Sequence, residues 1–228
     1  MGDFFVATNF YARMVIKVIT AQARVFYCVH EKYSVKLNCY MIQGIVLAGG
    51  FSSRAESNKM HFVVDEKPIL LHTIESIFPF VEKVIVVTGY YDQDIRSFIK
   101  EDEKIKIIYN KDYEKGMFSS VLTGVKQTTD DFFILPGDIP FIKRETFEAL
   151  IGGKKKVRIP IYQGKEGHPL FISKELKEEL LNEPLESNLR AFRDRQDKEL
   201  IPVNDKNILR DIDTKEQYEA LLAERKIV

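Results

Sequence analysis

The chain has 228 residues, of which 45% are hydrophobic and 30% charged, and this composition is typical of one folded globular domain. It argues against a disordered chain, a collagen-like fibre or a disulfide scaffold. The 34 basic and 34 acidic residues cancel, so we expect no nucleic-acid partner. The apolar runs fall short of the roughly 18 residues of a membrane span, so we expect no membrane partner. Two cysteines and the lack of a secretory signal predict a cytoplasmic protein.

The first 40 residues differ in composition from the rest. Both cysteines, Cys28 and Cys39, lie in this segment, whereas all eight prolines lie beyond it. Met41 opens an apolar run that is typical of the start of a domain. We therefore expect an atypical extension over 1–40, upstream of a native start at Met41, and a main domain over 41–228. The alternative is a genuine β-rich arm that adds strands or covers a partner subunit.

From Met41 onward, strand-length apolar runs alternate with segments of helical spacing. Strands are expected at Gly44–Ala48, Lys83–Thr88, Ile105–Tyr109 and Phe132–Leu135. Helices are expected between them, at Ile69–Ile77, Gln93–Ile99 and Phe118–Lys126. This alternation predicts an α/β fold of three layers, in which helices cover both faces of a mostly parallel, right-handed wound sheet.

Beyond Pro140 the pattern is less regular, which is typical of an α+β part that covers a substrate. Further strands are expected at Val157–Tyr162, His168–Ile172 and Ile208–Asp211. Further helices are expected at Arg144–Leu150, within Lys174–Leu181 and Leu189–Asp194, and at Lys215–Glu224.

A glycine-rich turn follows the first strand of the main domain. Within Leu47–Arg54, Gly49 and Gly50 let backbone N–H groups point into a common space that suits a phosphate. Arg54 and Lys59 add two cations that can clamp a polyphosphate. The alternative is a tight turn with two solvated basic residues. The turn matches neither G-x-x-x-x-G-K-[ST] nor G-x-G-x-x-G, which disfavours P-loop and Rossmann sites.

Aspartates mark two later segments. Asp138 follows a buried strand, and ligands of wound α/β sheets bind beyond the carboxyl ends of the strands. We therefore expect Asp138 beside the glycine turn as a ligand of Mg²⁺; the alternative is a cap for the helix near Arg144. Asp211 and Asp213 lie on one face of an extended segment before a helix. One can complete the metal site while the other caps the helix, or the pair can serve as a cap alone.

Five short motifs stand in order along the main domain. They are L-A-G-G-x-S-x-R at 47–54 with a following lysine, G-M-F-S-S-V-L-T-G-V at 116–125, L-P-G-D-I-P at 135–140, G-H-P-L-F at 167–171 and D-I-D-T at 211–214. In their chain order, these motifs make residues 42–222 resemble the molybdenum cofactor nucleotidyltransferases. The spacing of Arg54 and Lys59 looks like that of the cytidylyltransferase branch, which favours CTP over another NTP.

The resemblance implies a GT-A-like fold and a Mg²⁺-dependent transfer of a nucleoside monophosphate, with release of pyrophosphate. The acceptor implied is molybdopterin or another phosphorylated small molecule, and a molybdoenzyme is a further candidate partner. The implied catalytic residues are Arg54, Lys59 and Asp138, and the implied metal ligands are Asp138 with Asp211 or Asp213. The implied acceptor site is Ser119, Ser120 and His168. The implied nucleotide site comprises Leu47, Ala48, Gly49, Gly50, Ser52, Ser53, Arg54, Lys59, Thr88 and Gly89.

Several of these roles have alternatives. Ser119 and Ser120 can cap a helix, and His168 can bond a backbone carbonyl within its loop. Glu56 replaces a glycine of the family pattern, and it faces either the phosphates or solvent. Two further functions stay open: a transferase for a sugar phosphate or another small metabolite, and a non-catalytic nucleotide-binding partner of a molybdoenzyme.

Overall fold

The computed structural model describes residues 5–7, 14–18, 25–30, 33–38, 41–50 and 59–225. The chain forms two compact units, Met1–Met41 and Ile42–Val228. In the first unit, β1 (Phe5–Ala7), β2 (Met14–Val18), β3 (Val25–His30) and β4 (Tyr33–Asn38) form an antiparallel sheet in chain order. That 1–40 is an extension upstream of the native start stays a prediction.

The second unit is built around a parallel half-sheet. Its strands are β5 (Ile42–Ala48), β8 (Lys83–Thr88), β9 (Ile105–Tyr109) and β10 (Asp131–Pro136), in the order β10-β5-β8-β9. Every residue of β5 is buried, as expected for a strand covered on both faces. After β9 the chain returns to the other side of β5, so the strand order reverses between β5 and β10. Such a switch point is where wound sheets bind ligands.

The other half of the sheet is mixed. β13 (Leu170–Ile172) pairs antiparallel with β10, and β11 (Val157–Tyr162) pairs antiparallel with β13. β11 also pairs with β12 (Lys165–Glu166) and, in parallel, with β14 (Lys198–Pro202). The mostly parallel wound sheet predicted from the sequence is confirmed, and its antiparallel side comes from the less regular second half of the chain.

One predicted strand is wrong. Lys206–Leu209 is a short 3₁₀ helix (η5) that covers the first half of the strand expected at Ile208–Asp211, and the other half is not a strand either. Ile208 is apolar because its side chain is buried in the core, and not because it belongs to a strand. Its carbonyl accepts a hydrogen bond of 2.9 Å from the backbone N–H of His168. The strand in this region is β14, an edge strand. Its charged residues and terminal proline are tolerated at a sheet edge, but they interrupt the apolar pattern by which a strand is predicted.

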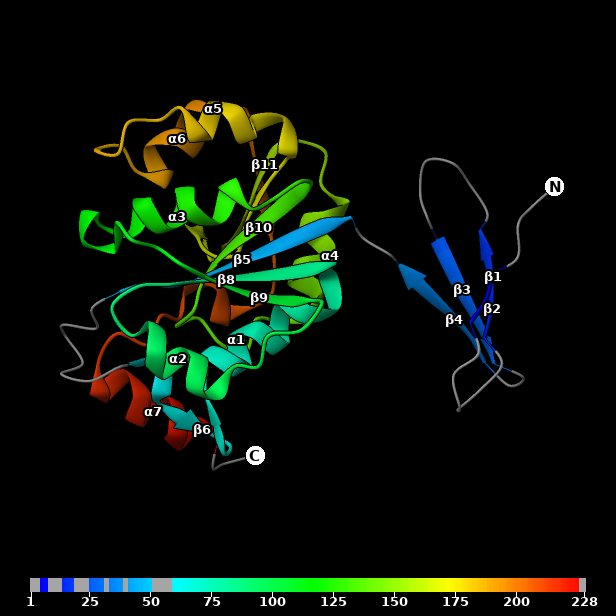
Figure 1. The fold of residues 1–228 in the computed structure, drawn as a ribbon, viewed down its shortest axis with the longest axis horizontal. Helices are drawn as coiled ribbons and strands as arrows, with labels where there is room; N and C mark the ends of the chain where they lie inside the picture. Colours follow the sequence, from blue (N-terminus) through cyan, green and yellow to red (C-terminus); the bar gives the residue numbers. More distant parts are fainter. Residues whose placement is uncertain are drawn as a thin grey trace. The chain divides into compact units, whose positions relative to one another are not determined.

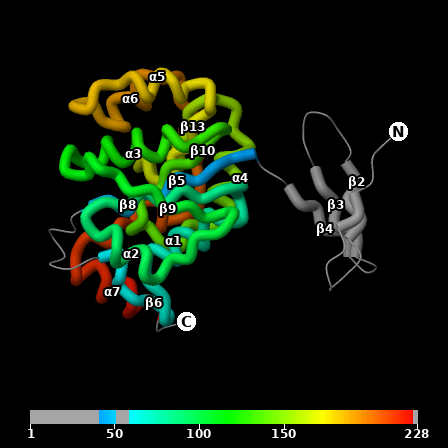
Figure 2. The backbone as a smooth tube through the Cα atoms, viewed as in Figure 1, coloured from blue at the N-terminus to red at the C-terminus, as the bar shows by residue number. Residues whose placement is uncertain are grey.

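Helices cover both faces of the sheet, so the predicted three-layer architecture is confirmed (Figure 1). Figure 2 shows α3 (Met117–Lys126), α5 (Lys177–Leu181) and α6 (Leu189–Arg195) on one side. There Phe118, Val121 and Phe192 pack with Ile45 and Val87 of the sheet. The other side carries α1 (Ile69–Ile77), α2 (Asp92–Phe98) and α4 (Arg144–Gly152).

The last helix packs beside a small β-hairpin. α7 (Lys215–Arg225) packs through Leu221 against Val64 and Ile69, next to the hairpin of β6 (Val63–Val64) and β7 (Lys67–Pro68). The remaining short 3₁₀ helices are η1 (Lys59–His61), η2 (Phe78–Phe80), η3 (Tyr113–Lys115) and η4 (Lys174–Leu176). Within the described ranges, no helix has the length and apolarity needed to cross a membrane.

Candidate active site

Backbone turns meet where the parallel strands end. Ala48 pairs with Thr88 at the ends of β5 and β8, and a glycine follows each strand. A Cβ built on Gly89 would lie 2.9 Å from the Gly49 Cα, and one on Gly49 would lie 2.7 Å from the Ser120 Oγ. Neither position has room for a side chain, whereas a Cβ on Gly50 would meet none of the described residues within 4 Å. Gly89 and Gly49 are therefore needed by the fold, whereas the described residues do not crowd Gly50.

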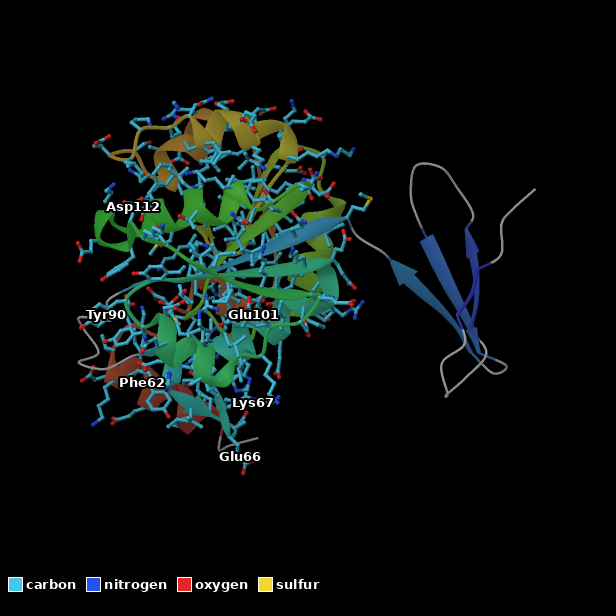
Figure 3. All side chains as sticks on the ribbon, in the orientation of Figure 1. Phe62, Glu66, Lys67, Tyr90, Glu101 and Asp112 are labelled. Atoms are coloured by element: carbon cyan, nitrogen blue, oxygen red, sulfur yellow. The ribbon has the colours of Figure 1, made fainter. Side chains whose placement is uncertain are left out.

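The end of β8 is fixed by its own hydrogen bonds. The buried Thr88 hydroxyl donates to the Asp92 carboxylate at the start of α2, and the Gly89 carbonyl accepts from the Asp92 N–H at 3.1 Å. Tyr90, labelled in Figure 3, is 56% exposed and helps to line a hollow of about 490 Å³ with Gly89 and Tyr109. Thr88 and Gly89 thus shape this turn, and their contact with a nucleotide stays a prediction.

A lysine joins two carboxylates at the switch point. The Lys59 Nζ in η1 lies 2.5 Å from Asp138 Oδ2 and 2.5 Å from Asp213 Oδ1. The Gly137 N–H donates to the Leu47 carbonyl at 2.8 Å, which holds the Asp138 backbone against the end of β5. The structure therefore brings Asp138 together with Lys59 and with the start of the glycine turn, both of which lie far from it in the chain.

Burial and charge shift the pKa values of this cluster. Asp138 is 8% exposed, and burial raises the pKa of its carboxyl above the ordinary value although Lys59 acts in the opposite direction. Burial alone would lower the pKa of Lys59, but the carboxylates of Asp138 and Asp213 outweigh it and raise the pKa. The ammonium is therefore charged at neutral pH. Among the described residues, Asp138 Oδ1 is buried and lacks a hydrogen-bond partner.

The structure separates the two aspartates that the sequence left equivalent. Asp213 contacts Lys59, whereas Asp211 is exposed and lies in a surface hollow with Arg210 and Glu224. Between them Ile212 is fully buried, and its N–H donates to the Asp138 carbonyl at 3.1 Å. This bond holds the segment against Asp138, and the Asp213 N–H is fixed in turn by a hydrogen bond of 2.7 Å to Gln217 Oε1.

Helix caps come from residues other than these aspartates. At the start of α7, the Thr214 N–H donates to Gln217 Oε1 at 2.9 Å and the Gln217 N–H donates to Thr214 Oγ1 at 3.3 Å, which is a capping box. At α4, Asp205 accepts from the Lys143 N–H at 2.7 Å and from the Thr146 hydroxyl at 2.9 Å. The alternative that Asp138 caps the helix near Arg144 is therefore wrong.

A buried asparagine organises the start of α3. The Asn110 Nδ2 donates to Ser119 Oγ at 2.8 Å and to Ser120 Oγ at 3.0 Å, and its Oδ1 accepts from the Asp112 N–H at 3.0 Å. The Ser119 hydroxyl donates back to loop carbonyls, and both serines are buried. These hydroxyls hold α3 against the strand ends, and their predicted contact with the acceptor stays a prediction. The sequence offered no signal for Asn110 beyond its position after a strand.

A cavity of about 330 Å³ lies on the other face of α3. Its apolar wall includes Phe118 and Val121, and His168 and Arg193 also line it. The Arg193 guanidinium donates to Glu166, which also accepts from Lys198 at 3.0 Å. His168 Nδ1 and Arg193 Nε are buried without a hydrogen-bond partner among the described residues. Sequence reasoning found His168 but missed Glu166 and Arg193, because distant elements bring them together.

The surroundings of His168 keep its ring neutral. Burial, with the positive charge of Arg193 second, lowers the pKa of His168 from 6.5 to about 4. The backbone N–H of His168, and not its ring, donates a hydrogen bond to the carbonyl of Ile208. A neutral ring with a buried, unpartnered nitrogen can bind a ligand as hydrogen-bond donor or acceptor, but it is a weak source of positive charge.

Ser52, Ser53 and Arg54 of the predicted nucleotide site lie outside the described residues, as does Glu56. Their predicted roles stay predictions. Leu47 and Ala48 are buried at the end of β5, so their side chains belong to the core, and the backbone of the following turn is what can face a ligand.

This chain resembles several known proteins. The molybdenum cofactor cytidylyltransferase of Escherichia coli strain K12 is 28% identical over 179 residues, which cover 78% of this chain and 93% of that protein. The molybdopterin-guanine dinucleotide biosynthesis protein A of Archaeoglobus fulgidus has a TM-score of 0.64 and 17% identity over 82% of this chain and 100% of the other. Rv0371c of Mycobacterium tuberculosis H37Rv, solved in complex with manganese, has a TM-score of 0.63 and 19% identity over 81% of this chain and 99% of the other.

At these identities the two structures establish a shared fold, the GT-A-like fold of nucleotidyltransferases. The sequence itself gives the family. Residues 44–200, more than half of the chain, match the family described as the MobA-like NTP transferase domain. The resemblance drawn from the motifs is thereby confirmed, and the chain belongs to the family of MobA-like NTP transferase domains.

Proposed function

We propose that this protein transfers CMP from CTP to a terminal phosphate of molybdopterin and releases pyrophosphate. The observation that carries the proposal is the Lys59–Asp138–Asp213 cluster at the switch point, beside the turns of Gly49 and Gly89. The likeness to a cytidylyltransferase over most of both chains supports the choice of nucleotide and acceptor. A molybdoenzyme that receives the product is the proposed partner.

The nucleotide side is proposed to bind through backbone and charge. None of the described residues would crowd a Cβ on Gly50, so on their side a phosphate can approach the backbone there. Lys59 supplies a mobile cation on a flexible stem, which suits the non-bridging oxygens of a triphosphate. Arg54 is proposed to add a planar, bidentate donor to the same phosphates. All three act on groups that every NTP shares, so they provide affinity more than choice of base.

Asp138 and Asp213 are proposed to hold a divalent cation, with Mg²⁺ foremost. The residues fit such an ion, because carboxylate oxygens are its preferred ligands and the buried Asp138 Oδ1 lacks another partner among the described residues. Two protein carboxylates are also enough when substrate phosphates complete the ligands. When bound, the cation would neutralise charge on the triphosphate and on the leaving pyrophosphate.

The cavity behind α3 is proposed to hold the acceptor. Phe118 and Val121 offer an apolar wall for a flat ring system. His168 Nδ1 and Arg193 Nε, which have no hydrogen-bond partner among the described residues, offer hydrogen bonds, although Arg193 Nε also lies 3.6 Å from Asp194 Oδ1. The guanidinium of Arg193 favours a ligand that carries negative charge. Ser120 belongs to the same helix and touches the glycine turn, so α3 links the two proposed binding sites.

The chemistry proposed for these residues is alignment. An oxygen of the acceptor phosphate attacks the α-phosphorus of CTP, a new P–O bond forms, and the bond to the β-phosphate oxygen breaks. Lys59 and Arg54 would stabilise the charge that moves onto pyrophosphate, and no covalent enzyme intermediate is required.

Pyrophosphate release tests the proposal. The full chain is incubated with Mg²⁺ and each of CTP, GTP, ATP and UTP, with molybdopterin or with sugar phosphates as acceptor. Release with CTP and molybdopterin, and much less with the other pairs, is expected. Release with a sugar phosphate instead would assign another acceptor, and nucleotide binding without release for any acceptor would contradict a transferase.

A further inference from the structure

Groups that the proposed function assigns to different ligands are bound to one another. Lys59 is assigned to the triphosphate, and Asp138 and Asp213 are assigned to the divalent cation. In the structure the Lys59 Nζ lies 2.5 Å from an oxygen of each carboxylate. Asp138 Oδ1 has no hydrogen-bond partner among the described residues and is open to a cation. Asp138 Oδ2 and Asp213 Oδ1, by contrast, cannot bind the same ion without weakening their contacts with the ammonium.

The charges of the cluster sharpen this conflict. The two carboxylates carry two negative charges, and Lys59 neutralises one of them. The side chains are well shielded from water, with exposures of 13% for Lys59, 12% for Asp138 and 27% for Asp213. Because screening is weak at such positions, an added cation is repelled by the ammonium as well as attracted by the carboxylates. A nucleotide that draws the ammonium away would remove that repulsion.

The backbone around the cluster is held while the lysine stem can move. Met60, next to Lys59 in η1, is 5% exposed, and its sulfur would lie 3.1 Å from a Cβ on Gly137. On the other side, the buried Ile212 is bonded to the Asp138 carbonyl. The two carboxylates are thus fixed by their segments, whereas the four-carbon stem of lysine has several rotamers.

We propose that Lys59 competes with the divalent cation for Asp138 and Asp213, and that the nucleotide relieves this competition by taking the ammonium onto its phosphates. This inference rests on the proposed function and adds a regulation of the same site. Metal and nucleotide then bind cooperatively, and each tightens the other by the same factor. The protein alone holds a divalent cation weakly, so the ion enters mainly together with its nucleotide.

The test measures Mn²⁺ binding to the full chain without nucleotide, from the electron paramagnetic resonance signal of free Mn²⁺. Lys59→Met removes the competitor and is expected to tighten Mn²⁺ binding about fivefold or more, the lower end of usual coupling between sites. Lys59→Arg keeps the charge and is expected to stay as weak as the wild type. Lys67→Met removes a surface lysine that pairs with Glu75, and it controls for the change in net charge.

Equal or weaker Mn²⁺ binding by Lys59→Met, in a chain whose circular dichroism matches the wild type, would overturn the inference. If that variant does not fold, Lys59→Gln takes its place and the same criterion applies. A second measurement determines CTP affinity with and without Mn²⁺, and the enhancement by Mn²⁺ should be smaller in the variant than in the wild type. An equal enhancement would also overturn it.

Failure of the proposed function gives a different result. If Asp138→Asn added to Lys59→Met leaves Mn²⁺ binding as tight as in Lys59→Met alone, the metal assignment itself is wrong. If Lys59→Met tightens Mn²⁺ binding while no acceptor yields pyrophosphate, the competition holds and the transferase proposal fails.

Discussion

The proposed nucleotide side and the proposed acceptor side of this site are built by different means. The nucleotide side lies at the ends of parallel strands, and its side chains Lys59, Asp138 and Asp213 bind one another. The acceptor side lies against the antiparallel half of the sheet. It combines an apolar wall with buried nitrogens of His168 and Arg193 that have no hydrogen-bond partner among the described residues.

The difference indicates how each side recognises its ligand. On the nucleotide side, a charged ligand must replace contacts that the side chains already make with one another. Binding there therefore depends on the charge of the ligand and on its access to the backbone. On the acceptor side, a ligand can supply hydrogen bonds that the fold leaves unmade, each of which costs about 1–3 kcal/mol when unsatisfied. The second arrangement discriminates more strongly between ligands, because an analogue without the matching group leaves the cost in place.

The largest effect is expected on the nucleotide side. Asp138→Asn removes the buried charge that both Lys59 and the proposed cation require, and turnover should fall about a thousandfold, which corresponds to about 4 kcal/mol. Pyrophosphate release under saturating substrates measures this. Asp197→Asn, at an exposed aspartate paired with Lys155, is the control and should retain activity. If Asp138→Asn kept most of its activity, the metal assignment would be lost.

On the acceptor side, pH should reveal the buried His168. Its pKa is lowered from 6.5 to about 4 in the folded protein, so between these values the unfolded chain binds a proton that the folded chain does not. Stability contributed by this residue is therefore complete above pH 6.5 and is lost as pH falls toward 4, by roughly 3 kcal/mol at most. Urea unfolding from pH 7 to pH 4 measures it.

The comparison needs variants that cannot titrate. His168→Asn and His168→Gln should lose less stability than the wild type over the same pH range, and their own slopes should agree. Parallel slopes for wild type and variants would mean that the ring is protonated as easily in the folded chain as in the unfolded one.

Substitutions of the glycines at the strand ends should distinguish effects on stability from effects on CTP binding. Gly89→Ala places a Cβ against the Gly49 backbone, so it should destabilise the fold by about 2 kcal/mol and weaken CTP binding. Gly50→Ala meets none of the described residues within 4 Å, so it should lower the melting temperature less than Gly89→Ala does while it weakens CTP binding about tenfold. Thermal unfolding and CTP titration test both variants. Unaltered CTP binding by Gly50→Ala would show that no phosphate approaches that backbone.

The sequence predicted the parallel half of the molecule better than the mixed half. Runs rich in β-branched residues marked β5, β8, β9 and β10, because strands buried on both faces are almost wholly apolar. Their shared direction then placed Gly49 and Asp138 at one edge. β14 escaped notice because a strand at the margin of the sheet tolerates charge and proline.

Within the site, the sequence identified charges but not their partners. It could not choose between Asp211 and Asp213, since the choice is made by an ion pair between Asp213 and Lys59, which lie 154 positions apart in the chain. It could not show that Arg193 meets Glu166, since a helix and a strand far apart in the chain bring them together. The capping box was readable as T-x-x-Q, and recognising Thr214 would have released both aspartates from a capping role.

The smallest effect concerns that capping box, which positions Asp213 for the nucleotide side. Thr214→Ala removes the hydroxyl that accepts from the Gln217 N–H, so it should cost about 1 kcal/mol in thermal unfolding. Gln217→Ala removes the reciprocal acceptor of the same box, and the double variant should cost less than the sum of the two. Strict additivity would mean that the two side chains act independently. Because the Asp213 N–H also donates to Gln217 Oε1 at 2.7 Å, we expect any loss of Mn²⁺ affinity in these variants to come mainly from displacement of Asp213.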